Sequence, residues 1–137
     1  MMSAESGRLF AYLSYRDAHA AIDWLTAAFG FTVVTKQLSE DASEVIHCEM
    51  RRGDAVIMLA GYDRDYQPPP AVVGSSTGGG LYIYVDDVGA VWDSAVASGA
   101  TVLYAPEQTE WGTSRFRVLD PEGHEWTFGT YLPGEGW

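Results

Sequence analysis

The sequence predicts an α+β fold in which two βαβββ modules follow one another along the chain. The main reason is an internal repeat: Asp17 and Gly30 enclose one amphipathic segment, and Asp86 and Gly99 enclose a second at the same spacing. In both copies Thr-Val follows shortly after the Gly, as the start of a new strand. The second reason is the alternation of apolar and polar residues around these segments, which is typical of strands. A repeat on this scale indicates a duplicated module, with a groove built from both halves.

The first module begins with an alternating run over residues 8–15, which predicts a strand. Asp17 is placed to cap the helix that follows, and Gly30 can adopt the left-handed conformation that ends it. One apolar stripe runs along this helix: Ala21, Ile22, Leu25, Ala28 and Phe29. Three further strands are expected at about 31–38, 44–51 and 55–60, separated by turns at 40–43 and 52–54.

The second module repeats this order after a connection over residues 61–80 that is rich in Pro, Ser and Gly. A connection of this length is typical of a linker or of a lid over a site. The module is expected to hold a strand at 81–85, a helix at about 87–98 and strands at about 100–104, 115–119 and 125–131. Residues 105–114 are expected to form a loop, and Asp120-Pro-Glu-Gly123 a type I turn.

Composition and charge narrow the classes of partner. The net charge of −11 argues against nucleic acid, which needs a basic face, and favours cationic ligands at long range. The sequence contains no run of 18 apolar residues, so we expect no membrane span. Residues 1–8 lack the pattern of a signal peptide, and Cys48 is the single cysteine, so we expect a cytoplasmic protein without an intrachain disulfide.

Four segments resemble the vicinal oxygen chelate superfamily, which contains glyoxalase I, bleomycin-resistance proteins and extradiol dioxygenases. They are residues 15–31, 47–59, 84–87 and 111–126, which look like the first strand–helix unit, the first hairpin, the opening of the second module and the last hairpin, in the style of the glyoxalase/bleomycin-resistance-like group. The resemblance implies a single domain over residues 1–137, with module 1 at about 8–62, a linker at 63–79 and module 2 at about 80–132. It also implies paired curved mixed sheets that enclose a cupped groove, and a homodimer in which modules pair within or between chains.

The resemblance further implies four metal-ligand positions, one on each of four strands. In this chain they fall on Phe10, Met58, Gly80 and Thr127, which are not ligands for Zn²⁺, Ni²⁺ or Fe²⁺. We therefore expect no metal cofactor and no glyoxalase I or dioxygenase activity. A displaced metal site would have to use His47 and Glu49, with help from Glu125 or a Tyr.

Strand alternation predicts which side chains line the groove. If Leu9, Leu13, Ile46, Cys48, Leu81, Ile83, Trp126 and Phe128 face the helices, the opposite face is aromatic with a few charged groups. The expected ligand-binding residues are Phe10, Tyr12, His47, Glu49, Met58, Tyr82, Tyr84, Trp111, Arg115, Arg117 and Glu125. The alternative is that this face is a filled core in which Arg and Glu satisfy one another.

Two functions follow from this face. The first is the binding of a small aromatic or cationic molecule, of the kind that sequesters an antibiotic. The second is a metal-independent lyase or isomerase in which His47, Glu49 or Glu125 acts as acid or base. A metalloenzyme with displaced ligands remains a third alternative.

Overall fold

The computed structural model describes residues 6–63 and 65–135 and contains two four-stranded sheets and two helices. The first module holds β1 (Ala11–Ser14), α1 (Ala18–Phe29), β2 (Thr32–Leu38), β3 (Val45–Arg52) and β4 (Ala55–Ala60). The second holds β5 (Leu81–Tyr84), α2 (Val88–Ala97), β6 (Thr101–Gln108), β7 (Ser114–Leu119) and β8 (Glu125–Gly129). The predicted tandem α+β arrangement is therefore confirmed.

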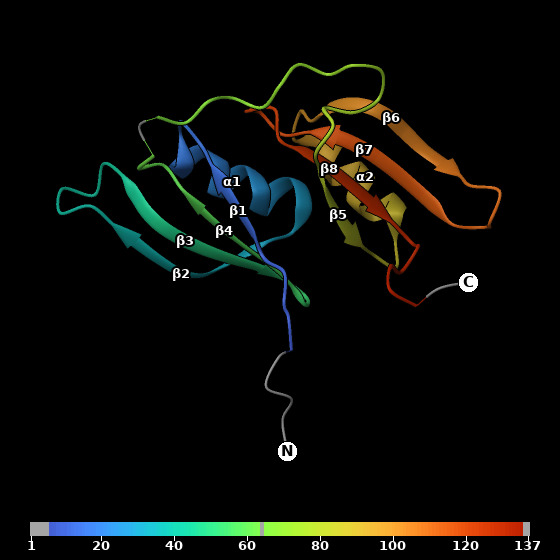
Figure 1. Cartoon of the computed structure of the whole chain (residues 1–137), viewed down its shortest axis with the longest axis horizontal. Helices are drawn as coiled ribbons and strands as arrows, with labels where there is room; N and C mark the ends of the chain where they lie inside the picture. The colour runs from blue at the N-terminus through green and yellow to red at the C-terminus, as the bar shows by residue number, and fades with distance from the viewer. Residues whose placement is uncertain (1–5, 64, 136–137) are drawn as a thin grey trace.

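The two sheets have the same topology. Sheet 1 has the strand order β1-β4-β3-β2, and sheet 2 has the order β5-β8-β7-β6. In each sheet the first strand pairs in parallel with the last, and the other neighbours are antiparallel. β1 and β5 are the strands that face one another across the middle of the molecule (Figure 1).

Each helix begins at an aspartate whose carboxylate accepts a hydrogen bond from the first turn. Asp17 Oδ1 accepts from the Ala20 amide at 3.0 Å, and Asp87 Oδ1 accepts from the Ala90 amide at 3.0 Å. The repeat therefore aligns Asp17 with Asp87, and the alignment with Asp86 is wrong by one residue. Gly30 and Gly99 both adopt left-handed φ values, 78° and 84°, so the ends of the two copies do correspond. The second helix is simply shorter than the first.

One hydrophobic core joins the two modules through their helices. Phe29 at the end of α1 lies with its ring centroid 5.1 Å from Trp126 and 4.7 Å from Phe128, both on β8 of the other module. Ser94 on α2 donates a hydrogen bond to the Ala28 carbonyl at 2.7 Å. The helix-facing sides of both sheets are thus covered, and their opposite sides are left as outer faces.

Strand alternation predicts most of the helix-facing residues correctly. Cys48, Ile83, Trp126 and Phe128 are buried in the core, and Leu13 and Leu81 pack against it. Leu9 and Ile46 were assigned to the same side wrongly, because they are 97% and 42% exposed. Leu9 precedes β1 and has no partner strand. Ile46 is the extra residue of a β-bulge, where Leu38 pairs with Val45 and Gln37 with His47.

Several element boundaries differ from the prediction. β1 and β8 are shorter than expected, whereas β6 extends through Gln108 into the segment predicted as a loop, because it pairs with the whole of β7. The connection contains no helix or strand among its described residues, 61–63 and 65–80, apart from an isolated bridge between Val73 and Ser76. No helix in the described part of the chain is long and apolar enough to cross a membrane.

The turn before β8 fastens the second module to the first. Asp120 is buried, and its carboxylate accepts hydrogen bonds from the Tyr15 hydroxyl at 2.6 Å and the Trp126 indole at 3.1 Å. Glu122 in the same turn accepts from the backbone amides of Arg16 and Asp17 at 2.6 and 2.9 Å, just before α1. The Asp-Pro-Glu-Gly turn therefore holds the β1–α1 junction in place.

Candidate binding site on sheet 2

The outer face of sheet 2 carries two rows of side chains that run across the strands. In the first row Tyr104, Arg117, Thr127 and Tyr82 are successive register partners on β6, β7, β8 and β5. In the second row Arg115 pairs with Gly129, which in turn pairs with Tyr84. Directly paired residues share a face, so the aromatic and basic side chains are gathered on one surface.

A cavity of about 230 Å³ lies at one end of this face. Three of the predicted ligand-binding residues line it: Tyr82, Trp111 and Arg115. The other lining residues are Thr109, Thr113, Ser114 and Tyr131. We call this cavity the aromatic pocket. Its walls combine three aromatic side chains with a single cationic side chain, which suits a planar organic ligand.

The position of Tyr82 is fixed on two sides. Its hydroxyl donates to the Tyr131 carbonyl at 2.6 Å. A Cβ atom at Gly129 would come within 2.6 Å of the Tyr82 hydroxyl, so only glycine leaves room for this ring. Burial raises the pKa of Tyr82 above its usual value, and this effect outweighs the opposite effect of the Arg115 guanidinium. Tyr82 is therefore a neutral, oriented wall of the pocket at physiological pH.

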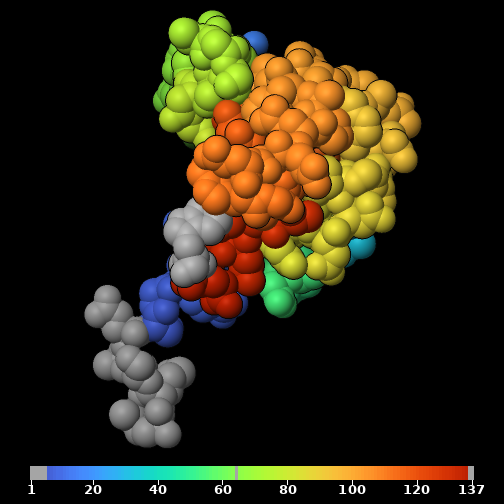
Figure 2. Space-filling view, turned by 90° about the vertical axis from the view of Figure 1, so that its right-hand side faces the viewer, coloured from blue at the N-terminus to red at the C-terminus, as the bar shows by residue number. Residues whose placement is uncertain are grey.

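Trp111 is presented by a braced turn between β6 and β7. Thr109 donates its amide to the Thr113 carbonyl at 2.8 Å, and the hydroxyls of these two residues are 2.7 Å apart. Gly112 has a φ of 83°, which a residue with a side chain adopts only with strain. The Trp111 side chain is 62% exposed, so it stands in solvent beside the pocket. In Figure 2 this β6–β7 hairpin, in orange, forms much of the visible face.

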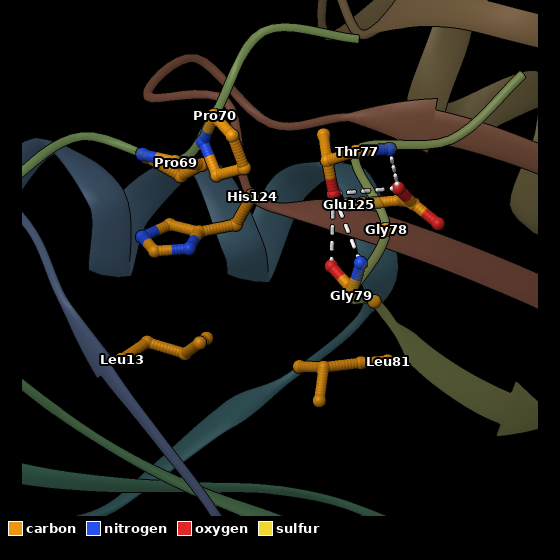
Figure 3. Close-up of a pocket in the computed structure, with 10 residues that line it drawn as sticks. Leu13, Pro69, Pro70, Thr77, Gly78, Gly79, Leu81, His124 and Glu125 are labelled. Atoms are coloured by element: carbon orange, nitrogen blue, oxygen red, sulfur yellow. Dashed lines mark hydrogen bonds between the residues drawn. The ribbon is translucent and has the colours of Figure 1, made fainter. Parts of the chain in front are cut away.

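Glu125 lies elsewhere, beneath the connection between the modules (Figure 3). It is 5% exposed and accepts hydrogen bonds from the Thr77 amide at 2.6 Å and from the hydroxyls of Thr77 and Ser76. Burial alone would raise the pKa of this carboxyl, but these hydrogen bonds and the Arg117 guanidinium at 3.5 Å hold it below its usual value. This geometry anchors the connection onto β8 and leaves Glu125 weakly basic.

A second cavity, of about 600 Å³, borders this anchor. It is lined by Leu13 and Leu81 on the two modules, by His124 and Glu125, and by the connection at Pro69, Pro70 and 77–80. Figure 3 shows the prolines and Thr77 on one side of this space and the two leucines on the other. The lining is mainly apolar side chain and glycine backbone, with no cluster of charged groups aimed inward.

The remaining predicted residues lie on the first module. Glu49, Met58 and Tyr12 are register partners across sheet 1, and His47 Nε2 lies 2.8 Å from Glu49 Oε2. Phe10 lies just before β1, in a cleft of about 620 Å³ between the edges of β1 and β5 that Tyr82 also lines. The ligand-binding residues expected from the sequence are therefore divided among the outer faces of the two sheets, this cleft and the buried site of Glu125.

The four positions that the family resemblance assigns to a metal do not fit one. Tyr12 and Tyr82, rather than Phe10 and Gly80, are the partners of Met58 and Thr127. Thr127 Oγ1 accepts a hydrogen bond from Arg117 Nε at 2.7 Å, which places a guanidinium where a cation would sit. Within residues 6–63 and 65–135, no three His, Cys, Asp or Glu side chains gather in a way that could hold a metal ion.

Two residues of the site were missed in the sequence. Tyr131 shares the alternation of Thr127 and Gly129, so continuing the pattern past β8 would have found it. Tyr104 is harder to find, because β6 has register shifts between Val102 and Glu107 that break the alternation. The cation–π contacts of Tyr104 with Arg115 and Arg117 become evident only once β6 and β7 are paired.

Comparison with known proteins agrees with this architecture. Residues 9–128 match the Glyoxalase/Bleomycin resistance protein/Dioxygenase superfamily. An uncharacterised protein of Mycobacterium bovis is 31% identical over 124 residues, which cover 88% of this chain and 81% of that protein. An uncharacterised protein of Mycobacterium tuberculosis is also 31% identical over 124 residues, covering 88% of this chain and 72% of that protein.

Solved structures show the same fold. TioX from Micromonospora sp. ML1 is 25% identical with a TM-score of 0.72, covering 93% of this chain and 100% of TioX. Glyoxalase I from Zea mays is 19% identical with a TM-score of 0.71, covering 90% of this chain and 44% of the maize protein, and this likeness concerns the fold alone. On the family match, the relatives and the tandem modules together, the chain belongs to the glyoxalase/bleomycin resistance protein/dioxygenase superfamily.

Proposed function

We propose that this protein binds a planar aromatic small molecule in the aromatic pocket of sheet 2. The observation that carries the proposal is the meeting of Tyr82, Trp111 and Tyr131 around a cavity of about 230 Å³. A cavity of about 150 Å³ lined by apolar side chains is large enough to bind benzene. The aromatic pocket thus has room for a compound of one or two rings, stacked against its aromatic walls.

Preorganisation supports the proposal. The braced turn fixes the backbone at Trp111, and the Tyr131 carbonyl together with Gly129 fixes the ring of Tyr82. A ligand that stacks on Tyr82 therefore has little entropy of that side chain to remove, so more of the contact energy contributes to affinity. Arg115 at the rim supplies a polar group that can fix the ligand's orientation.

The test is a titration calorimetry series with planar aromatic compounds on the wild-type protein and two variants. Trp111→Ala removes one wall of the pocket and should weaken binding about five- to tenfold, as expected for an aromatic contact of about 1–1.4 kcal/mol. Tyr12→Ala removes an exposed aromatic from the outer face of sheet 1 and serves as the matched control. Equal losses in both variants, or no binding by the wild type, would count against the proposal.

A second function is supported by the His47–Glu49 pair on sheet 1. The 2.8 Å contact between imidazole and carboxylate orients the ring, as in a general base held by a carboxylate. We propose this pair as the acid–base group if the protein is a metal-independent enzyme. His47→Gln should then abolish turnover and leave binding at the aromatic pocket unchanged. Turnover that survives the substitution would remove the pair from the mechanism.

We also propose that the protein is a homodimer. The side chains just before β1 are apolar and open to solvent in the single chain: Leu9 is 97% exposed and Phe10 is 40% exposed. Ile46 on β3 adds a further exposed apolar group. Exposed apolar surface of this kind is a common mark of a protein interface. Light scattering at micromolar concentration should give twice the chain mass of 15.0 kDa, and a monomer would refute the dimer.

A further inference from the structure

The cavity of about 600 Å³ beneath the connection has no part in the function proposed above. Among the described residues it shares no lining side chain with the aromatic pocket, and it lies between β1 of one module and β5 of the other. Small-molecule sites are typically clefts of about 300–1,000 Å³ with mainly apolar walls and a few placed polar groups. The cavity has this size, so its walls decide what it can hold.

The connection forms a roof over the cavity that is fastened to the second module on both sides. Thr77 donates its amide and its hydroxyl to the buried Glu125 carboxylate at 2.6 and 2.8 Å. On the other side the Tyr66 ring stacks on His124 with a centroid distance of 6.1 Å. The prolines at 69–70 lie between these two attachments in the sequence. The cavity is therefore bounded by a segment that side-chain contacts hold in place.

The walls are apolar on opposite sides of the space. Figure 3 shows Pro69 and Pro70 of the connection on one side and Leu13 and Leu81 of the two modules on the other. Both leucines pack against the core but are only partly buried. The glycines at 78–80 are exposed, so the cavity is open to solvent at this edge. A ligand that enters here would complete the burial of the two leucines, which favours an apolar compound.

One hydrogen-bond acceptor faces this apolar space. His124 Nε2 lies 2.8 Å from the Ser14 carbonyl oxygen, which can only accept, so Nε2 carries the proton of the neutral ring. Nδ1 is then an acceptor, and no group within residues 6–63 and 65–135 donates a hydrogen bond to it. In Figure 3 the second ring nitrogen of His124 lies on the side of the ring that faces Leu13. A ligand with a donor group could bond to it.

The carboxylate of Glu125 limits the charge of such a ligand. Glu125 lines the cavity and is ionised at neutral pH, because its hydrogen bonds from Thr77 and Ser76 outweigh the effect of burial on its pKa. An anion placed beside it would be repelled and would lose its hydration. A cation would find no free carboxylate, since Glu125 already accepts these hydrogen bonds and pairs with Arg117 at 3.5 Å. The surroundings therefore favour a neutral molecule.

We propose that this cavity is a second ligand site, which takes a neutral, mainly apolar molecule bearing one hydroxyl group. The hydroxyl donates to His124 Nδ1, and the hydrocarbon part lies between the two prolines and the two leucines. This site does not depend on the function proposed for the aromatic pocket.

The test compares three cage-shaped probes by titration calorimetry: 1-adamantanemethanol, its isomer 1-methoxyadamantane, and 1-adamantanecarboxylate. Their globular shape does not suit stacking against the walls of the aromatic pocket. The alcohol should bind about fivefold more tightly than the ether, which has no proton to donate, as expected for one neutral hydrogen bond. The carboxylate should bind at least about tenfold more weakly than the alcohol, because it faces the ionised Glu125.

Substitutions locate the site. His124→Phe keeps an aromatic ring and should make the alcohol and the ether bind equally. Leu13→Ala removes an apolar wall and should weaken both neutral probes several-fold. Val73→Ala is the matched control on the connection, because Val73 is 84% exposed and does not line the cavity, and it should leave all affinities unchanged. Urea unfolding of each variant checks that the fold is retained.

Nuclear magnetic resonance on the wild-type protein gives a test that needs no variant. The largest amide shifts with 1-adamantanemethanol should fall at residues 77–81 and at His124. Shifts centred elsewhere, or failure of all three probes to bind, would overturn the second site. Equal affinities for the alcohol and the ether, a preference for the alcohol that survives His124→Phe, or tighter binding of the carboxylate would also overturn the proposal. None of these results bears on the aromatic pocket, which is tested with planar compounds.

Discussion

Replacing Tyr15 by Phe removes one hydroxyl from the junction of the two modules and leaves the ring in place. The lost interaction is the hydrogen bond of 2.6 Å from the Tyr15 hydroxyl to the Asp120 carboxylate, both of them buried. Burial and the neighbouring carboxylate raise the pKa of Tyr15 above its usual value, so the hydroxyl remains a donor throughout the neutral and mildly alkaline range. The ring contact with His124, at a centroid distance of 4.7 Å, survives in the variant.

The size of the expected loss in the free energy of unfolding depends on the hydrogen bonds that Asp120 retains in the variant. It still accepts from the Trp126 indole and from the amides of Glu122 and His124, so it is not left unpaired. A hydrogen bond to a charged group contributes about 1.5–3 kcal/mol, and we expect a loss of about 2 kcal/mol in the free energy of unfolding. For a chain of 137 residues this corresponds to a fall in Tm of about 7 °C.

The assay is urea unfolding at pH 7, followed by far-UV circular dichroism and by tryptophan fluorescence. Tyr12→Phe, at a residue that is 54% exposed, is the control and should change the free energy of unfolding by less than about 0.5 kcal/mol. A Tyr15→Phe variant as stable as the control would refute the view that the Asp120 turn fastens the modules together.

Three further predictions concern the helix cap, the pocket wall and the buried anchor. Asp87→Ala should lower the free energy of unfolding by about 1 kcal/mol, whereas Asp86→Ala should have little effect; equal effects in urea unfolding would contradict the capping role of Asp87. Gly129→Ala should displace the Tyr82 ring and weaken planar ligands at least about tenfold in calorimetry, since the new Cβ would lie 2.6 Å from the Tyr82 hydroxyl. Glu125 has a lowered pKa in the folded state, so its contribution is present above the unfolded value of about 4.3 and is lost as the pH falls through the folded value. Glu125→Gln should therefore reduce the free energy of unfolding at pH 7 by about 1–3 kcal/mol, and that free energy should fall less steeply below about pH 4.3 than in the wild type. A fall below about pH 4.3 as steep as that of the wild type, measured by urea unfolding, would contradict this account of Glu125.

Much of the fold can be predicted because its determinants are local. A carboxylate at each helix start, a glycine at each helix end and a repeated order of strands specify both modules without any tertiary information. The repeat is misaligned by one residue at Asp86 because two adjacent aspartates precede α2, and only the hydrogen bond from the Ala90 amide shows that Asp87 corresponds to Asp17. The error at Ile46 arises because a β-bulge interrupts the alternation of β3.

The site is less predictable because it depends on pairing between strands. Tyr82, Trp111 and Arg115 were chosen from the sequence, but their meeting at one pocket requires the register of β5 to β8 and the turn at Gly112. In the sequence Glu125 resembles a catalytic group, because strand alternation places its side chain on the face of β8 that lies opposite the helices. The structure places it beneath Ser76 and Thr77, segments whose position no local pattern specifies.

The most direct test of the central claim is chemical-shift mapping by nuclear magnetic resonance on the isotope-labelled protein during titration with 2-naphthoate. The account predicts that the largest amide shifts fall at Tyr82, Trp111, Arg115 and Tyr131, which surround the aromatic pocket. Sheet 1, including His47 and Glu49, should be nearly unaffected. Shifts centred on sheet 1 or on the cleft between β1 and β5, or no shifts at millimolar ligand, would contradict the claim that this pocket binds a planar ligand.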